Sequence, residues 1–275
     1  MICVHEYLDE SSDMEQYDFI LETVQKAGTL LLEKRTKGFT ISTKENDVRN
    51  IVTSADETVN EFLEGEIRRV FPDHSIYSEE SKAYQTDSDY QWTLDPLDGS
   101  SNFARDIPHY AVCLGVLTSG VPTAGAVYNP VTNELFSFRK GKGAFLNGSK
   151  IQVSSVTDMS KAEILFSGGG RDKNLWEWGV SVYRTLLTKV AKRGLLGCSS
   201  LDVCFVAAGR VEACVYGTLT ALDIAPAFGI LEEAGGIARN EEGKPLVLSS
   251  FPQKTYVANS TVFLETLHVL LKGSD

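Results

Sequence analysis

A run of short apolar segments between residues 109 and 153 constrains the fold of this chain more than any other feature. Within it, large apolar residues alternate with small or polar ones over stretches of strand length. The stretches are interrupted at Ser119-Gly120, Asn129-Pro130, Gly141-Lys142-Gly143 and Asn147-Gly148. Such sequences favour tight turns, and strands joined by tight turns pair antiparallel. The region is therefore predicted to form an antiparallel meander.

Two amphipathic helices are predicted to precede the meander. Apolar residues recur at helical spacing from Tyr17 to Arg35, and a loop then follows through Asn50. Ser54, with Glu57 three residues later, resembles a capping box at the start of a second helix, which Phe71-Pro72 ends. We expect both helices to cover one face of the sheet.

The second half of the chain alternates helices with short strands, which is typical of an α/β arrangement. Helical spacing is found near residues 174–192, 200–208, 223–234 and 261–272. Short apolar segments that resemble strands lie at residues 162–166, 211–216 and 256–258.

The polar stretch at residues 154–160 is the predicted domain boundary. It separates an α+β domain over residues 17–153, with two helices and a mostly antiparallel sheet, from an α/β domain over residues 154–275. Residues 1–16 are predicted to be an acidic N-terminal leader, since they have neither the basic start nor the apolar core of a targeting peptide. No flexible linker separates the halves, so we expect them to share an interface.

The composition of the chain limits the classes of binding partner that we expect. The chain has 275 residues, 43% of them hydrophobic, enough for a substantial core. Its net charge of −11 disfavours binding to nucleic acid or to an anionic membrane surface, and no apolar run reaches membrane-spanning length. Four of the five cysteines sit in apolar segments without metal-ligand spacing, which indicates reduced thiols and a cytoplasmic protein. An anionic substrate would need local cations.

Residues 95–102 combine two carboxylates, a glycine and two hydroxyls after a predicted strand at residues 90–94. Pro96 is expected to end the strand and leave Asp95 at its tip. Asp98 can turn back toward the same point, and the Leu97 carbonyl offers a further oxygen. Oxygen ligands of this kind suit Mg²⁺.

The residues that follow favour a phosphate site. Gly99 can adopt positive φ, while Ser100, Ser101 and Asn102 start helices, whose free N–H groups attract anions. The same residue types occur in ordinary turns. A turn, however, has no need of a second partly buried carboxylate, because burial of that charge costs free energy unless a cation neutralises it.

Four other residues carry candidate chemistry. Glu79 and Glu80 follow a strand-like segment, and because adjacent strand residues point opposite ways, one of them faces the Asp95 cluster. Asp223 either caps the helix that it opens or is a partly buried carboxylate in need of a cation. Cys198 lies in a loop, but a catalytic thiol would want a histidine partner that the sequence does not suggest.

The chain resembles the inositol monophosphatase family, within the wider superfamily of Mg²⁺-dependent, Li⁺-sensitive phosphatases that includes fructose-1,6-bisphosphatases. The resemblance covers nearly all of the chain beyond the leader. It rests on six ordered blocks, at residues 51–56, 78–81, 92–103, 141–148, 206–211 and 222–226 with 233–236.

The resemblance implies a layered α-β-α-β-α sandwich and two to three Mg²⁺ ions. By similarity, Glu79, Asp95 and the Leu97 carbonyl would hold one ion, Asp95, Asp98 and Asp223 a second, and Glu79 a third, weaker one. The implied reaction is in-line attack on phosphorus by a metal-activated water.

The resemblance also implies roles for residues around the metals. Gly99, Ser100 and Ser101 would cradle the phosphate, and Ser100, with Glu79 and the residue at position 50, would activate the water. The implied substrate-binding set further includes Cys198, Ser199, Tyr216 and Asp223. Family members are commonly homodimers.

Three departures from the family pattern bear on function. Asn50 stands where the family usually has Asp, so the position can orient but cannot accept a proton. Ser100-Ser101 is the pattern of the bisphosphatase side of the superfamily. Tyr216 replaces a glutamate that often binds inositol hydroxyls.

The leading hypothesis is a Mg²⁺-dependent phosphomonoesterase for a small polyol or sugar phosphate, with inositol 1-phosphate the first candidate. Alternatives on the same fold are a fructose-1,6-bisphosphatase, a 3′(2′),5′-bisphosphate nucleotidase or a histidinol-phosphatase. A catalytically weakened binding or regulatory protein is a further alternative, supported by Asn50 alone.

Overall fold

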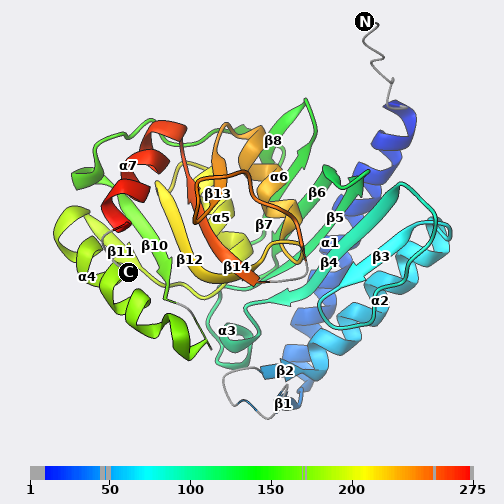
Figure 1. Ribbon diagram of the computed structural model, residues 1–275. Helices are drawn as coiled ribbons and strands as arrows, with labels where there is room; N and C mark the ends of the chain where they lie inside the picture. The colour runs from blue at the N-terminus through cyan, green and yellow to red at the C-terminus, as the bar shows by residue number, and fades with distance from the viewer. Residues whose placement is uncertain are drawn as a thin grey trace, which may run out of the picture.

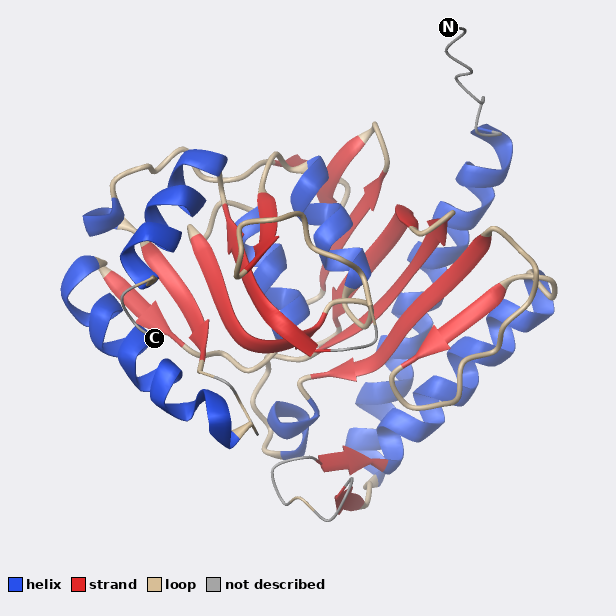
Figure 2. Ribbon diagram, in the orientation of Figure 1, coloured by secondary structure: helices blue, strands red, loops and turns tan. Residues whose placement is uncertain are grey.

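The computed structural model describes residues 10–43, 47, 51–168, 170, 172–249 and 252–272. Its elements stack in five layers, in which a seven-stranded and a five-stranded sheet are covered outside and separated inside by helices (Figures 1 and 2). This confirms the predicted α-β-α-β-α sandwich. No helix in the described ranges is long and apolar enough to span a bilayer.

The first outer layer consists of α1 (Glu10–Lys37) and α2 (Ser54–Val70). Both pack against the seven-stranded sheet, as predicted (Figure 1). The helix α1 begins at Glu10 rather than Tyr17, so the end of the predicted leader is helical. The rest of that leader, residues 1–9, lies outside the described residues.

The start of α2 differs from the prediction by one residue. The N-cap is Thr53, whose side chain accepts hydrogen bonds from the N–H groups of Ala55 and Asp56. The Asp56 carboxylate in turn accepts a hydrogen bond from the Thr53 N–H, which completes the capping box. The predicted pair, Ser54 and Glu57, therefore lies inside the helix.

The seven-stranded sheet contains the predicted meander. Its order is β3-β4-β5-β6-β7-β8-β9, and all neighbours pair antiparallel except β3 and β4, which are parallel. The strands are β3 (Ser75–Ser78), β4 (Tyr90–Asp98), β5 (Ala111–Thr118), β6 (Val121–Asn129), β7 (Glu134–Arg139), β8 (Gly143–Leu146) and β9 (Ser149–Ile151). A separate antiparallel pair joins β1 (Ile41–Thr43), within the predicted loop, to β2 (Ile51–Thr53), which lies between that loop and α2.

Strand β4 does not end at Asp95, contrary to the prediction from Pro96. Asp95 pairs with Cys113, the register then shifts, and pairing resumes between Asp98 and Ala111. The irregularity accommodates the missing N–H of proline inside the strand. It also places both carboxylates on one strand end.

The five-stranded sheet has the order β11-β10-β12-β14-β13. Its strands are β10 (Glu163–Ser167), β11 (Lys192–Gly194), β12 (Ala213–Thr220), β13 (Ile237–Asn240) and β14 (Pro252–Ala258). Strand β10 pairs parallel with β11 and β12, whereas β14 pairs antiparallel with β12 and β13. Strands β11 and β13 are additional to those predicted. The boundary proposed at residue 154 stays a prediction.

The remaining helices complete the layers. They are α3 (Ser100–Ala104), α4 (Trp176–Lys189), α5 (Ser199–Ala207), α6 (Ala225–Glu233) and α7 (Thr261–Leu271), with short 3-10 turns at Met159–Lys161 and Lys173–Leu175. Helices α5 and α6 lie between the sheets, and α4 and α7 cover the outer face of the five-stranded sheet (Figure 1).

Two glycines let α6 lie close to the seven-stranded sheet. Gly115 on β5 and Gly125 on β6 face each other across the strands and lie under Pro226 in the first turn of α6. A Cβ on Gly125 would lie 2.9 Å from Pro226 Cβ and 2.9 Å from Phe138 Cε1. The packing therefore fixes where α6 begins, next to Asp223.

Gly125→Ala is expected to lower the free energy of unfolding by about 1–3 kcal/mol, the usual cost of overpacking a core. Gly65→Ala is the matched control, because Gly65 is exposed on α2 and its Cβ would meet nothing within 4 Å. That change should stabilise the protein by about 0.5–1 kcal/mol through helix propensity. Denaturant unfolding of both variants measures the difference, and equal effects would contradict the packing argument.

Candidate functional site

The parallel pairing of β3 and β4 brings two carboxylates to one sheet edge. Ser78 pairs with Leu94, so the residues that follow, Glu79 and Asp95, lie side by side. The Glu79 N–H donates to the Leu94 carbonyl at 3.4 Å. Glu79 and Asp95 line one cavity, whereas Glu80 lines a different depression beside α2. Glu79 is therefore the glutamate that faces the cluster.

Asp95 is a buried carboxylate among other carboxylates. It is 4% exposed, and its Oδ1 accepts the Leu97 N–H at 2.9 Å. Burial, and then the charges of Glu79, Asp98 and Asp223, raise the pKa of Asp95 well above its usual value. The site is thus electrostatically unfavourable when it holds only protein charges.

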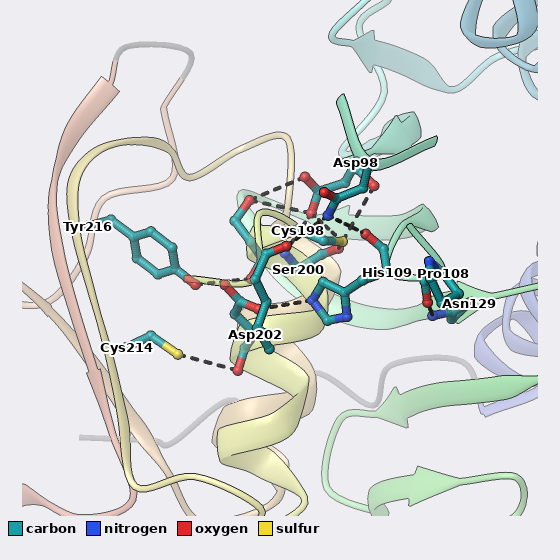
Figure 3. A network of polar contacts seen from close by, with 12 residues as sticks. Asp98, Pro108, His109, Asn129, Cys198, Ser200, Asp202, Cys214 and Tyr216 are labelled. Atoms are coloured by element: carbon teal, nitrogen blue, oxygen red, sulfur yellow. Dashed lines mark hydrogen bonds and ion pairs between the residues drawn. The ribbon is translucent and has the colours of Figure 1, made fainter. Parts of the chain in front are cut away.

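Asp98 is held by the N-terminus of α5 (Figure 3). Its Oδ2 accepts the Ser200 N–H at 2.6 Å, the Cys198 thiol at 3.2 Å and the Ser199 hydroxyl at 3.3 Å. The positive end of a helix favours a carboxylate at this position. Asp98 therefore joins β4 of one sheet to a helix that packs against the other.

A second contact supports the same junction. His109, in the segment before β5, lies 3.1 Å through Nε2 from Oδ1 of Asp202 on α5 (Figure 3). Burial raises the pKa of Asp202 to about 6, although the bond to His109 opposes the shift. The thiol of Cys198 is also buried, which raises its pKa well above the usual value. Cys198 faces Asp98 rather than a histidine, which disfavours a thiolate nucleophile.

Asp223 does not cap α6. The N-cap residue is Ile224, which leaves Asp223 one position outside the helix. Its Oδ1 is buried without a hydrogen-bond partner among the described residues, while Tyr77 and Thr220 bond to the carboxyl group. Burial, followed by the charge of Glu79, raises the pKa of Asp223 to about 7. An orphaned carboxylate oxygen facing other carboxylates is the chemistry that a divalent cation satisfies.

These carboxylates line one cavity of about 400 Å³. Its described lining contains five carboxylates, three hydroxyl side chains and no Lys, Arg or His. The lining residues are Glu79, Asp95, Asp98, Asp172, Ser199, Thr218, Leu219, Thr220, Asp223, Ile224 and Pro252. A phosphate ester could not enter such a cavity without cations to offset the repulsion.

Sequence reasoning missed three polar residues of the lining. Thr218 and Thr220 alternate on β12, so they share one face of a strand that the sequence prediction ended at Tyr216. Extension of the strand to Thr220 would have revealed them. Asp172 follows the glycine-rich segment that begins at Gly168, and no pattern in the sequence marks it as a site residue.

The predicted phosphate loop has the expected backbone. Gly99 is the N-cap of α3 with φ of 92°, a left-handed conformation that glycine adopts without strain. The Ser100 hydroxyl lies 2.8 Å from Asp56 Oδ1 and 2.9 Å from the Leu97 carbonyl oxygen. Ser101 is exposed, and its hydroxyl accepts a hydrogen bond from Arg105. Ser100, but not Ser101, is therefore hydrogen-bonded to Asp56 and to the Leu97 carbonyl.

Several predicted residues that the structure describes are not part of the cavity lining, namely Leu97, Gly99, Ser100, Ser101, Cys198 and Tyr216. Tyr216 is buried and directs its hydroxyl to the Ser199 carbonyl at 3.3 Å, so it lies behind the lining (Figure 3). The prediction for Asn50 falls outside the described residues. Asp56, which contacts Ser100, was not among the predicted site residues, although it belongs to a visible capping-box pattern.

The donor set fits a hard divalent cation, because every candidate ligand is oxygen and one carboxylate oxygen is orphaned. Across the described ranges, no three His, Cys, Asp or Glu side chains already converge as a closed ligand group. The carboxylates are therefore neighbours that a cation would draw together.

Asp95→Asn is expected to raise the unfolding temperature of the metal-free protein at pH 8. The folded state holds the protons of Asp95 and Asp223 more tightly than the unfolded state, so stability falls as pH rises from about 4, the unfolded value, through about 7, the folded value of Asp223. Asp95→Asn removes one of the repelling charges, so the folded protein loses less stability at pH 8.

Thermal unfolding in excess chelator at pH 5 and pH 8 measures the effect. The gain should be small at pH 5, where Asp95 and Asp223 of the folded protein are largely protonated. Asp87→Asn, which removes an exposed carboxylate before β4, should change neither value. A lower unfolding temperature for Asp95→Asn at pH 8 would contradict the assigned repulsion.

Comparison with known proteins places this geometry in a family. The sequence profile of the Inositol monophosphatase family matches residues 13–272. The Nus factor SuhB of Pasteurella multocida is 32% identical over 231 residues, which cover 84% of this chain and 86% of the relative. Inositol monophosphatase 3 of Solanum lycopersicum is 32% identical over 250 residues, which cover 88% of this chain and 92% of the relative.

Solved structures agree with the sequence relatives. The IMPase of Thermotoga maritima superimposes with a TM-score of 0.85 at 26% identity, over 95% of this chain and 98% of that chain. The chain belongs to the inositol monophosphatase family.

Proposed function

We propose that this protein is a Mg²⁺-dependent phosphomonoesterase that hydrolyses a small polyol or sugar phosphate. One observation carries the proposal: a cavity lined by five carboxylates and by no described basic side chain, in a fold of the inositol monophosphatase family. An anionic ester fits such a cavity only together with cations.

The residues that would hold the cations are Glu79, Asp95, the Leu97 carbonyl, Asp98 and Asp223, for two to three ions. Mg²⁺, when bound, would supply positive charge to the phosphoryl oxygens and make a water molecule more acidic. The orphaned Oδ1 of Asp223 and the raised pKa of Asp95 support this assignment.

The protein's own groups would orient the reactants. The N–H groups after Gly99 and the hydroxyl of Ser100 would bind phosphoryl oxygens and orient the attacking water. Glu79 would accept a hydrogen bond from that water. Asp98, which is hydrogen-bonded to α5, would keep the phosphate loop in a fixed position relative to the five-stranded sheet around the substrate.

The cavity favours a polyhydroxylated alcohol as the leaving group. Ser199, Thr218 and Thr220 present hydroxyls, and no aromatic ring occurs in the described lining to stack a nucleobase. This supports inositol 1-phosphate over a nucleotide 3′-phosphate. Fructose 1,6-bisphosphate and histidinol phosphate remain competing substrates, and Asp172 would suit the amino group of the latter.

Phosphate release across a panel of these esters tests the proposal. Hydrolysis should require Mg²⁺ and cease in excess chelator. Asp95→Asn should retain less than about a tenth of the wild-type turnover, since loss of a shared ligand costs more than about 1.4 kcal/mol of transition-state stabilisation.

Asp87→Asn is the matched control, because its carboxylate is exposed outside the cavity, and it should retain wild-type turnover. Equal loss in both variants, or full activity in chelator, would refute the metal assignment. A folded wild-type protein that hydrolyses none of the esters would favour the alternative of a binding or regulatory protein.

We also propose that the protein is a cytoplasmic homodimer. Helix α4 carries an apolar stripe of Trp176, Val180, Tyr183 and Leu187, which are 45%, 54%, 46% and 42% exposed. Such a stripe on one helix face is typical of an interface. The four described cysteines are free and buried, which supports a reducing compartment.

Light scattering of Val180→Glu combined with Leu187→Glu tests the dimer. We expect a dimer for the wild type and a monomer for the double variant, because two charges cannot be buried without partners. Val262→Glu on α7, also an exposed apolar site, should remain dimeric. A monomeric wild type would refute the proposal.

A further inference from the structure

The cavity lining contains a fifth carboxylate, Asp172, which the proposed metal centre does not use. Asp172 follows β10 in the chain and is the N-cap of the 3-10 turn at Lys173–Leu175. The metal-binding candidates Asp95 and Asp98 lie on β4 of the other sheet. The fifth carboxylate therefore reaches the cavity from the side of the five-stranded sheet.

A contact with β12 supports this placement. A Cβ on Gly170, two residues before Asp172, would lie 3.6 Å from the hydroxyl oxygen of Thr218. Thr218 and Ser199 line the same cavity with hydroxyl groups. The loop that carries Asp172 thus lies beside β12, the central strand of the five-stranded sheet, and next to hydroxyls that could bind an alcohol.

The charge of Asp172 is separate from that of the metal centre. Burial, and then the charges of Glu79 and Asp98, raise the pKa of Asp223 to about 7, and Asp172 is not among these main causes. Two divalent cations would balance the four carboxylates of the metal centre and leave Asp172 uncompensated. The described lining offers no Lys, Arg or His that could neutralise it.

Asp172 has one carboxylate oxygen to spare. Its Oδ1 accepts the Asn174 N–H at 2.9 Å, which caps the 3-10 turn. Its Oδ2 accepts no hydrogen bond from the part of the chain that the structure describes. The residue is exposed where it lines the cavity, so a ligand can reach the second oxygen.

We propose that Asp172 selects phosphate esters whose alcohol part carries an ammonium group, such as amino sugar phosphates. The inference rests on the proposed phosphatase function and narrows its substrate class. With the phosphate at the metal centre, the ammonium group donates a hydrogen bond to Asp172, and Thr218 and Ser199 bind hydroxyls of the same alcohol. A cavity of about 400 Å³ is of the size that binds small molecules.

Two matched pairs of esters test the proposal at pH 7 in excess Mg²⁺. Glucosamine 6-phosphate differs from glucose 6-phosphate by an amino group in place of one hydroxyl, and phosphoethanolamine differs in the same way from 2-hydroxyethyl phosphate. For the wild type, kcat/KM should be about fivefold higher for the ammonium ester of at least one pair, the effect of one exposed ion pair. The advantage should lie in KM, because bound substrate and transition state share the ion pair.

Asp172→Asn separates the charge from the cap, because asparagine caps helical turns as well as aspartate does. In this variant the two esters of a pair should differ by less than about twofold, and the neutral ester should keep its kcat within about twofold. Asp172→Lys should reverse the preference. Asp87→Asn, which removes an exposed carboxylate outside the cavity, should leave the preference unchanged.

The outcomes are distinct. Equal kcat/KM within both pairs for the wild type would overturn the inference, as would a preference that persists in Asp172→Asn. An equal loss for both esters of a pair in Asp172→Asn would assign the residue a structural role and overturn it too. Hydrolysis of other phosphate esters but of neither ammonium ester would overturn the inference alone. A wild type that hydrolyses no ester would refute the proposed function itself.

Discussion

The hydrogen bond between the Asp98 carboxylate and the Ser200 N–H is the interaction on which the site depends. Asp98 ends β4 of one sheet, and Ser200 lies in the first turn of the helix α5 that packs against the other. The bond between His109 and Asp202 makes a second connection two residues further along α5. These contacts tie the strand end that carries Asp98 to α5.

Much of the fold could be predicted from local patterns. The meander follows from alternation and turn residues, and the helices follow from apolar spacing. The first residue of α2 could not be predicted from the sequence, because Thr53-Asp56 and Ser54-Glu57 are both valid capping patterns one residue apart. The contact of Asp56 with Ser100 favours the first, and a tertiary contact of this kind is invisible in the sequence.

The end of β4 shows a similar limit. Pro96 was expected to terminate pairing, since it has no N–H to donate. The register shift between Asp95 and Asp98 absorbs the proline and lets the strand resume. Only the partner strand β5 determines that outcome, so the local sequence could predict the turn chemistry of residues 95–102 but not its position within a strand.

The site was predictable where carboxylates follow strands. The ends of two parallel strands and the start of α6 lie at one cavity. This arrangement brings together the carboxylates of Glu79, Asp95, Asp98 and Asp223. Thr218 and Thr220 were missed because the apolar pattern of β12 stops before the strand does. Asp172 comes from a loop whose position depends on the five-stranded sheet as a whole.

A cation explains why folding tolerates this concentration of charge. Burial and mutual repulsion raise the pKa values of Asp95 and Asp223, and one buried oxygen of Asp223 has no hydrogen-bond partner within the described part of the chain. Anomalous diffraction from crystals soaked in Mn²⁺, a stand-in for Mg²⁺ with similar oxygen ligands, locates the ions directly. We expect peaks in the cavity within about 2.5 Å of the Asp95 carboxylate oxygens. Well-occupied Mn²⁺ sites elsewhere, with none at Asp95, would contradict a metal centre between the two sheets.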